Sequence, residues 1–271
     1  MNRITARLAE ARQQGRKALV TYIVCGDPIA EATLTTMHAL VAAGVDIIEL
    51  GVPFSDPMAE GPVIALGHER ALANKASLRT TLSVVKAFRE TNTSTPVVLM
   101  GYANPVERMG YAVFASEASA AGVDGLLTVD LPPEEAAPLN AELKKVGIEN
   151  IFLLAPTTTR ERAQSIVSLA SGFLYYVSLK GVTGAGHLDV ASVENKLAEL
   201  RQLTDLPICV GFGIKDAATA KAIGQHADGA VVGSLLVARM AALADQSAEA
   251  IAAGVVELIA PIRTGLDELA K

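Results

Sequence analysis

The sequence has few cysteines, no long apolar run and no excess of positive charge, and each shortage excludes a class of protein. Only Cys25 and Cys209 occur in 271 residues, which excludes a disulfide framework and predicts two buried, inert thiols. No apolar stretch reaches the roughly 18 uncharged residues of a membrane span, and the charged N-terminal segment has no signal-peptide core. A net charge of -6 argues against a nucleic-acid-binding surface. We therefore expect a cytoplasmic protein that binds neither nucleic acid nor membrane.

The composition is that of a folded chain, with 51% hydrophobic and 19% charged residues. Short apolar runs recur along its whole length, and several are almost continuous Val, Ile and Leu, which is typical of strands buried on both faces of a parallel sheet. The predicted strands cover residues 18–24, 46–50, 96–100, 124–129, 150–154, 172–178, 207–211 and 228–232.

Helical patterns alternate with these strands, for example over 30–43, 133–145 and 190–203, and several end at a glycine. The segment AAGVDIIELG at 42–51 is echoed by AAGVDGLLTVD at 120–130, which indicates a repeated helix–turn–strand unit. No linker divides the chain. We predict an α/β fold in which residues 1–271 form a single (β/α)8 TIM barrel domain.

An extra N-terminal helix is also predicted, because Ile4, Leu8 and Ala11 share one side of the segment before the first strand. It would cover the floor of the barrel. A doubly wound open sheet is the rival architecture, and only the strand count separates the two.

Active sites of such barrels lie at the carboxyl ends of the strands, where Glu49 is the first candidate. Side chains alternate along its strand, so Glu49 shares an apolar face with Ile47. Desolvation there should raise the pKa of the carboxyl and suit it to acid/base catalysis, although a structural salt bridge is an equal alternative. The following loop, 51–64, carries Asp56 and Glu60, which either complete a carboxylate pair or belong to an ordinary polar turn.

Two later segments are rich in glycine. The loop at 178–190 could be a lid, an anion site or a flexible connection. The segments GFGIKD at 211–216 and GAVVGS at 229–234 follow the seventh and eighth predicted strands, where barrels commonly bind phosphate. Gly213, Gly233 and Ser234 are the candidates for that site.

Other chemistries find no support in the sequence. The four histidines, at positions 38, 68, 187 and 226, lack metal-ligand spacing, so no metal site is predicted. Nucleotide-binding and serine-hydrolase motifs are missing. Lys180 as a Schiff-base lysine ranks below the two carboxylates, because it lies in a glycine loop.

Several motifs together resemble one known family, the tryptophan synthase α subunit. They are YIVCGDP at 22–28, IELGVPFSDPMAEGP at 48–62, GYANP at 101–105, YYVSLKGVTGA at 175–185, GFGI at 211–214 and VGS at 232–234. The resemblance runs from about the first strand to the last, and ELGVPFSDP combined with KGVTG is highly specific.

The resemblance implies a lyase of tryptophan biosynthesis that cleaves indole-3-glycerol phosphate to indole and glyceraldehyde-3-phosphate. Glu49 would be the general acid/base that protonates the ring carbon carrying the glycerol chain. Glu60 stands where the family has an aspartate that partners the indole N–H, and Thr183 would reach it on lid closure. The additional methylene displaces the carboxylate by about 1.5 Å, and a misplacement of that order can cost roughly 100-fold in rate. Neither metal nor organic cofactor is implied.

The resemblance also implies which residues surround the substrate. The indole pocket would comprise Tyr22, Met100, Leu127, Val129, Leu153, Tyr175 and Phe212, with Tyr22 and Met100 standing where related chains often have Phe and Leu. The phosphate would lie on Gly184, Gly213, Gly233 and Ser234.

A partner is implied as well: a β subunit that carries pyridoxal phosphate, in an αββα heterotetramer, docked against residues 51–64 and 101–110. Two rival functions remain. The chain could be a weakly active α-like protein that mainly activates a β subunit, with Glu60 marking lost catalysis. It could also be another phosphate-sugar barrel enzyme such as an isomerase, which the loop at 51–64 does not support.

Overall fold

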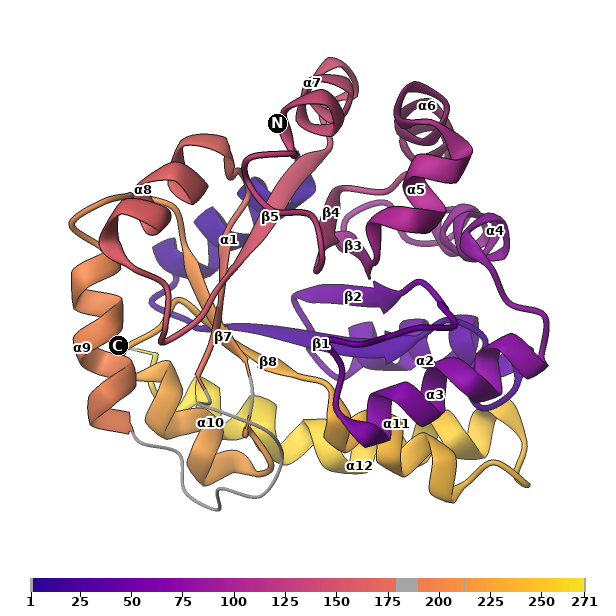
Figure 1. Ribbon diagram of the computed structural model, residues 1–271. Helices are drawn as coiled ribbons and strands as arrows, with labels where there is room; N and C mark the ends of the chain where they lie inside the picture. Colours follow the sequence, from indigo (N-terminus) through magenta and orange to yellow (C-terminus); the bar gives the residue numbers. More distant parts are fainter. Residues whose placement is uncertain (1, 179–189, 212, 271) are drawn as a thin grey trace.

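Eight parallel strands close into a barrel in the computed structural model, which describes residues 2–178, 190–211 and 213–270 (Figure 1). Each strand pairs with the next in the chain, and β8 pairs with β1. The closure confirms the predicted TIM barrel and excludes the open sheet. The strands are β1 (Ala18–Val24), β2 (Ile47–Gly51), β3 (Val97–Gly101), β4 (Gly125–Thr128), β5 (Glu149–Leu154), β6 (Leu174–Val177), β7 (Ile208–Gly211) and β8 (Gly229–Val232).

Helices surround the barrel, as Figure 1 shows, and Gly122 and Gly147 end two of them in the left-handed conformation, as predicted. None of the described helices is both long and apolar enough to cross a membrane. The helices are α1 (Arg3–Gln13), α2 (Ala30–Ala42), α3 (Pro62–Ala73), α4 (Leu78–Arg89), α5 (Ala103–Met109), α6 (Tyr111–Ala121), α7 (Ala137–Val146), α8 (Arg160–Leu169), α9 (Val190–Leu200), α10 (Ala217–Gly224), α11 (Ser234–Ala242) and α12 (Ala248–Asp267).

The interior of the barrel is built by alternate residues of each strand. One apolar cluster joins inward-facing residues of all eight strands, including Val20, Ile47 and Val98. Residues two positions further along these strands, Tyr22 and Glu49 among them, face the same side nearer the carboxyl ends. The core therefore gives way to polar groups at that end of the barrel.

Helix α1 covers the other end, as predicted. Its residues Ile4, Leu8 and Ala11 are buried, and Ile4 and Leu8 belong to the apolar cluster of the barrel interior. A Cβ on Gly125 would come within 2.8 Å of the Ile4 Cδ1 atom, so this glycine makes room for the helix.

The repeated glycine–valine–aspartate segment has a structural purpose at the amino ends of the strands. Asp46, just before β2, accepts a hydrogen bond from the Leu19 N–H of β1 at 2.9 Å, and Asp124, just before β4, accepts one from the Val97 N–H of β3 at 2.9 Å. Asp228 repeats the contact between β8 and β7. Each of the three carboxylates also pairs with an arginine, and the repeat therefore sets the register of paired strands.

Candidate active site

Glu49 lies inside the barrel, where strand alternation predicted it. Its side chain is 0% exposed, and neither carboxylate oxygen has a hydrogen-bond partner in the described part of the chain. Burial, followed by the nearby charge of Glu60, raises the pKa of Glu49 to about 8. The carboxyl is therefore mainly protonated at neutral pH, and with the described residues it forms no salt bridge of the kind that the structural alternative required.

Glu60 is the second carboxyl of this site. It ends the loop after β2, two residues before α3 begins at Pro62. Burial raises its pKa to about 7, so it ionises before Glu49 as the pH rises. Asp56, in contrast, is exposed and accepts a hydrogen bond from the Ser55 hydroxyl. The carboxylate pair is therefore Glu49 and Glu60, and Asp56 belongs to a surface turn.

The loop that carries Glu60 is anchored by two buried side chains. The Phe54 N–H donates to Nδ1 of His68 at 3.1 Å, and the Ala59 N–H donates to the Tyr102 hydroxyl at 3.1 Å. The Phe54 and Tyr102 rings also stack, with centroids 5.0 Å apart. These contacts hold both ends of the loop against α3 and the end of β3.

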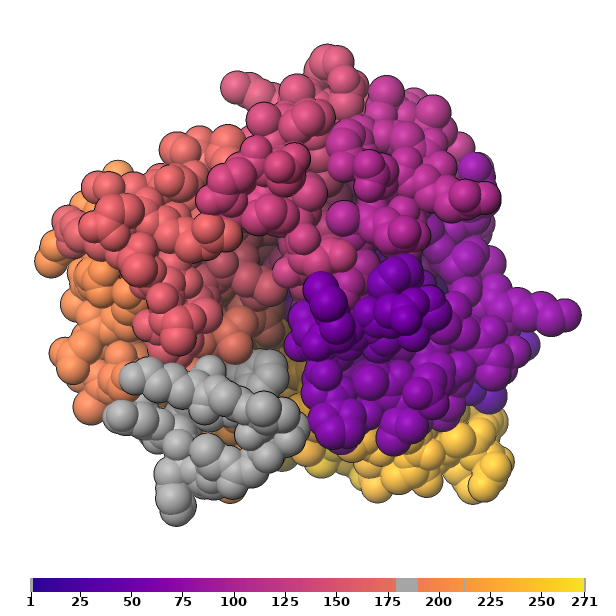
Figure 2. All heavy atoms as spheres, viewed as in Figure 1, coloured from indigo at the N-terminus to yellow at the C-terminus, as the bar shows by residue number. Residues whose placement is uncertain are grey.

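A cavity of about 190 Å³ opens where the loop after β2 faces the carboxyl ends of the strands. Figure 2 shows the segment after β2, in dark purple, on the face of the molecule turned to the viewer. Seven of the predicted site residues line the cavity: Tyr22, Glu60, Met100, Tyr175, Gly213, Gly233 and Ser234. The structure thus brings Glu60, two aromatic rings and the predicted phosphate-binding residues together.

Four other predicted residues lie near this cavity but not on its wall. Glu49, the register partner of Tyr22, is fully buried inside the barrel. Leu127 is fully buried in the apolar cluster of the barrel interior. Val129 and Leu153 line a neighbouring cavity at the ends of β4 and β5, and both pack against the same apolar cluster. The remaining predicted residues, Thr183, Gly184 and Phe212, lie outside the described residues, as does most of the loop at 178–190.

Gly213, Gly233 and Ser234 form one end of the cavity. Gly213 has a φ of +82°, a conformation that favours glycine. Gly233 is the N-cap of α11, which begins at Ser234, and a Cβ at Gly233 would lie 3.3 Å from the Cβ of Tyr22. The first N–H groups of a helix have no partner within it, so this end of the cavity offers donors to an anion.

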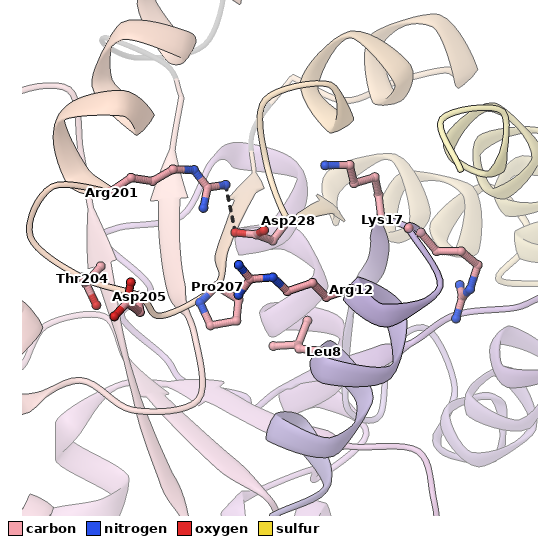
Figure 3. Close-up of a pocket in the computed structure, with 10 residues that line it drawn as sticks. Leu8, Arg12, Lys17, Arg201, Thr204, Asp205, Pro207 and Asp228 are labelled. Carbon is pink, nitrogen blue, oxygen red and sulfur yellow. Dashed lines mark hydrogen bonds and ion pairs between the residues drawn. The ribbon is translucent and has the colours of Figure 1, made fainter. Parts of the chain in front are cut away.

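A second cavity, of about 350 Å³, lies at the opposite end of the barrel (Figure 3). Several of its charged groups have partners within the protein: Arg201 pairs with Asp228 at 3.0 Å, and the Lys17 ammonium donates to the Ala227 carbonyl at 2.9 Å. Asp228 also accepts a hydrogen bond from the Ile208 N–H of β7, so its charge has a structural role in fixing the register of the strands. No group of three or more His, Cys, Asp or Glu among the described residues could hold a metal ion.

Comparison with known proteins identifies one family over nearly the whole chain. Residues 8–262 match the family Tryptophan synthase alpha chain. The tryptophan synthase alpha chain of Methylococcus capsulatus is 54% identical over 98% of this chain and 100% of its own length. The chain belongs to this family. The tryptophan synthase alpha chain of Thioalkalivibrio sulfidiphilus is 57% identical, again over 98% of this chain and 100% of its own length.

Solved structures agree. The tryptophan synthase subunit alpha of Legionella pneumophila superposes with a TM-score of 0.90 at 41% identity, covering 99% of each chain. The chain is therefore a lyase of tryptophan biosynthesis, and its reaction is the cleavage of indole-3-glycerol phosphate to indole and glyceraldehyde-3-phosphate. None of these matches favours a weakly active protein that mainly activates a β subunit, or an isomerase.

Two residues of the site were missed by the sequence analysis. His68 was considered only as a metal ligand, although its spacing from Ile64 and Ala71 places it on the inner face of α3. Tyr102 follows β3 directly and is almost fully buried. Its contact with the loop joins residues 43 positions apart, and no local pattern signals such a contact.

Proposed function

We propose that Glu49 is the proton donor and Glu60 the ionised partner of the indole ring in this reaction. The observation that carries the proposal is the buried Glu49 carboxyl, which has no hydrogen-bond partner among the described residues and a pKa raised to about 8. A neutral carboxylic acid can donate a proton, whereas the carboxylate of Glu60, which ionises first, can stabilise a positively charged ring.

The chemistry follows from these two protonation states. Glu49 donates its proton to the ring carbon that carries the glycerol chain, and Glu60 accepts a hydrogen bond from the ring N–H. The carbon–carbon bond then breaks, its electron pair returns to the ring, and the Glu49 carboxylate takes the proton of the adjacent hydroxyl. Indole and an aldehyde leave, and Glu49 is protonated again.

The cavity supports this substrate. Tyr22, Met100 and Tyr175 give it walls that suit a flat bicyclic ring, and Gly213, Gly233 and Ser234 give it an end with free backbone donors for the phosphate. We extend the ring pocket to Leu127, Val129 and Leu153 along the barrel interior. Thr183 and Phe212 at the ring and Gly184 at the phosphate are assigned by resemblance to the family.

The proposal needs no metal or organic cofactor, because the Glu49 carboxyl supplies and takes up the protons that the bond cleavage requires and the Glu60 carboxylate stabilises the ring. The expected partner is a tryptophan synthase β subunit in an αββα heterotetramer, and pyridoxal phosphate would belong to that partner. Exposed apolar side chains on the loop after β2 and on α3 suit such an interface: Met58 is 79% and Leu66 51% exposed. We place the complex in the cytoplasm, with the rest of amino-acid biosynthesis.

Indole formation from indole-3-glycerol phosphate tests the proposal, measured for the parent, Glu49→Gln and Glu60→Gln, each with and without β subunit. We expect the parent to release indole in both conditions and both variants to be strongly impaired. A parent that is inactive alone and with β subunit, yet still accelerates the β reaction, would show that its carboxyl groups no longer perform catalysis.

A further inference from the structure

Tyr22 and His68 form a buried hydrogen bond between the barrel interior and α3. The Tyr22 hydroxyl lies 3.3 Å from Nε2 of His68, and the two side chains are 3% and 1% exposed. The other ring nitrogen of His68, Nδ1, is bound by the Phe54 N–H at 3.1 Å. The histidine thus contacts a residue of the cavity wall with one nitrogen and the Glu60 loop with the other.

These two contacts fix the position of every proton between them. A backbone N–H can only donate, so Nδ1 of His68 must be the acceptor and carries no proton. The ring is neutral, in agreement with its pKa, which burial lowers to about 4. Its proton is therefore on Nε2, which donates to the Tyr22 oxygen.

Tyr22 must consequently direct its own proton elsewhere. Its oxygen accepts from His68, so its O–H is a donor without a role in that contact. Tyr22 lines the same cavity as Glu60. Burial and the nearby carboxylates hold the pKa of Tyr22 well above its usual value, so the hydroxyl keeps its proton.

Two carboxyl groups could accept from Tyr22. Glu49 is its register partner on β2, but it stays protonated to a higher pH and does not line the cavity. Glu60 ionises first, and a hydrogen bond to a carboxylate is shorter and stronger than one to a neutral acid. The ionised Glu60 is therefore the better acceptor.

We propose that Tyr22 is a positioning residue that donates a hydrogen bond to the ionised Glu60 carboxylate, and that His68 sets the direction of this donation. The bond is not made in the structure, and we infer that it forms when Glu60 loses its proton. It would hold the longer glutamate side chain, which has one more rotatable bond than aspartate, toward the ring N–H of the substrate. The inference rests on the proposed role of Glu60.

A double-mutant cycle tests the pair directly. The rate of indole formation is measured against pH for the parent, Tyr22→Phe, Glu60→Asp and the double variant. In the parent background, Tyr22→Phe should lower kcat about 10-fold, the usual worth of a hydrogen bond to a charged group, with a KM changed less than about 3-fold. It should also shift the acidic limb of the profile upward by about one pH unit, because the carboxylate loses a donor.

With Asp at position 60 the carboxylate is retracted, so adding Tyr22→Phe should change kcat less than about 3-fold. The charge of Glu60 also interacts with three other titratable groups, which stay unchanged in the cycle: Glu49, Tyr102 and Tyr175. Equal losses in both backgrounds, or an acidic limb that does not move, would overturn the inference. If Glu60→Gln is itself fully active, the proposed role of Glu60 fails instead.

Two substitutions of His68 separate its contacts. Glutamine can place an amide N–H near Nε2 and keep the donor to Tyr22, whereas asparagine can place its oxygen near Nδ1 and keep only the acceptor for Phe54. We expect His68→Gln to retain the acidic limb of the parent and His68→Asn to shift it in the direction of Tyr22→Phe. The same shift in both variants would show that His68 acts through the loop and not through Tyr22.

Discussion

Tyr22 and Glu49 are register partners on adjacent strands of the barrel. The preceding pair on the same inward face, Val20 and Ile47, is entirely apolar and belongs to the core cluster. The Glu49 carboxyl group therefore lies at the boundary between the packed interior and the cavity, where it is desolvated yet beside Tyr22, which lines the cavity. This position explains how one residue of an ordinary-looking strand becomes an acid at neutral pH.

Glu49→Gln should abolish indole formation and leave the fold intact. The amide has the shape of the acid but cannot transfer a proton, and general acid/base catalysis contributes roughly 10²–10⁴-fold. The loss of activity is measured as turnover of indole-3-glycerol phosphate, and the intact fold is checked by circular dichroism. Near-normal indole production by a folded Glu49→Gln protein would remove Glu49 from the mechanism.

The same substitution should stabilise the protein at higher pH. The pKa of Glu49 is about 8 in the folded chain against 4.5 when exposed, so the folded state binds more protons between these values. Stability from this group is complete below about pH 4.5 and falls by about 1.4 kcal/mol per pH unit until it is lost near pH 8.

Glu49→Gln removes this dependence. Urea unfolding between pH 5 and pH 8 should therefore show a gap that widens in favour of the variant, reaching on the order of 4 kcal/mol. Parallel curves for parent and variant would mean that the carboxyl ionises normally in the folded chain. A gap together with lost activity would show a catalytic group that costs stability.

The rate should have a bell-shaped dependence on pH. Glu60 must be ionised, so kcat/KM should fall as the pH drops through about 7, and Glu49 must be protonated, so it should fall again as the pH rises through about 8. The two values belong to the interacting pair. Steady-state rates from pH 5.5 to 9.5 check this, and a rate that still rises at pH 9 contradicts it.

The alternation of strands and glycine-ended helices was enough to predict the barrel, because each unit carries its own local signals. The inward direction of Glu49 also followed, since side chains alternate along a strand with a period of two. The helix over Ala103–Met109 was not named from the sequence, because seven residues are too few to show a helical period.

The partner of Glu49 could not be predicted from the residues alone. The loop after β2 has no periodicity, so the sequence does not decide whether Asp56 or Glu60 turns inward. That choice depends on the contacts of Phe54 with His68 and of Ala59 with Tyr102, which join distant positions. Resemblance to a family pointed to Glu60, whereas the residues alone did not decide between Asp56 and Glu60.

Ser234→Asp should weaken substrate binding without harming the fold. An acidic residue in the first turn of α11 favours the helix by about 0.3–1 kcal/mol, while its charge repels a phosphate at the same helix end. We expect KM to rise at least about 10-fold, with an unchanged or higher Tm. Ser234→Ala is the matched control, and its smaller effect would reflect the hydroxyl alone. Equal KM values for the two variants would place the phosphate elsewhere.

Substitutions of Glu60 test whether a longer side chain does the work of the family's aspartate. Glu60→Ala and Glu60→Gln should each lose most activity, because both remove the charge that stabilises the cationic ring. Glu60→Asp keeps that charge but retracts it by about 1.5 Å, so its rate shows whether the anchored loop has adapted to glutamate. A rate near that of the parent means that the loop tolerates both side-chain lengths, and a faster rate means that the loop has not adapted to glutamate.

Indole formation at pH 8, where the Glu60 carboxyl of the parent is mostly ionised, gives the comparison. If Glu60→Gln is as active as the parent, Glu60 is a bystander, and Asp56 on the same loop becomes the next carboxylate to test.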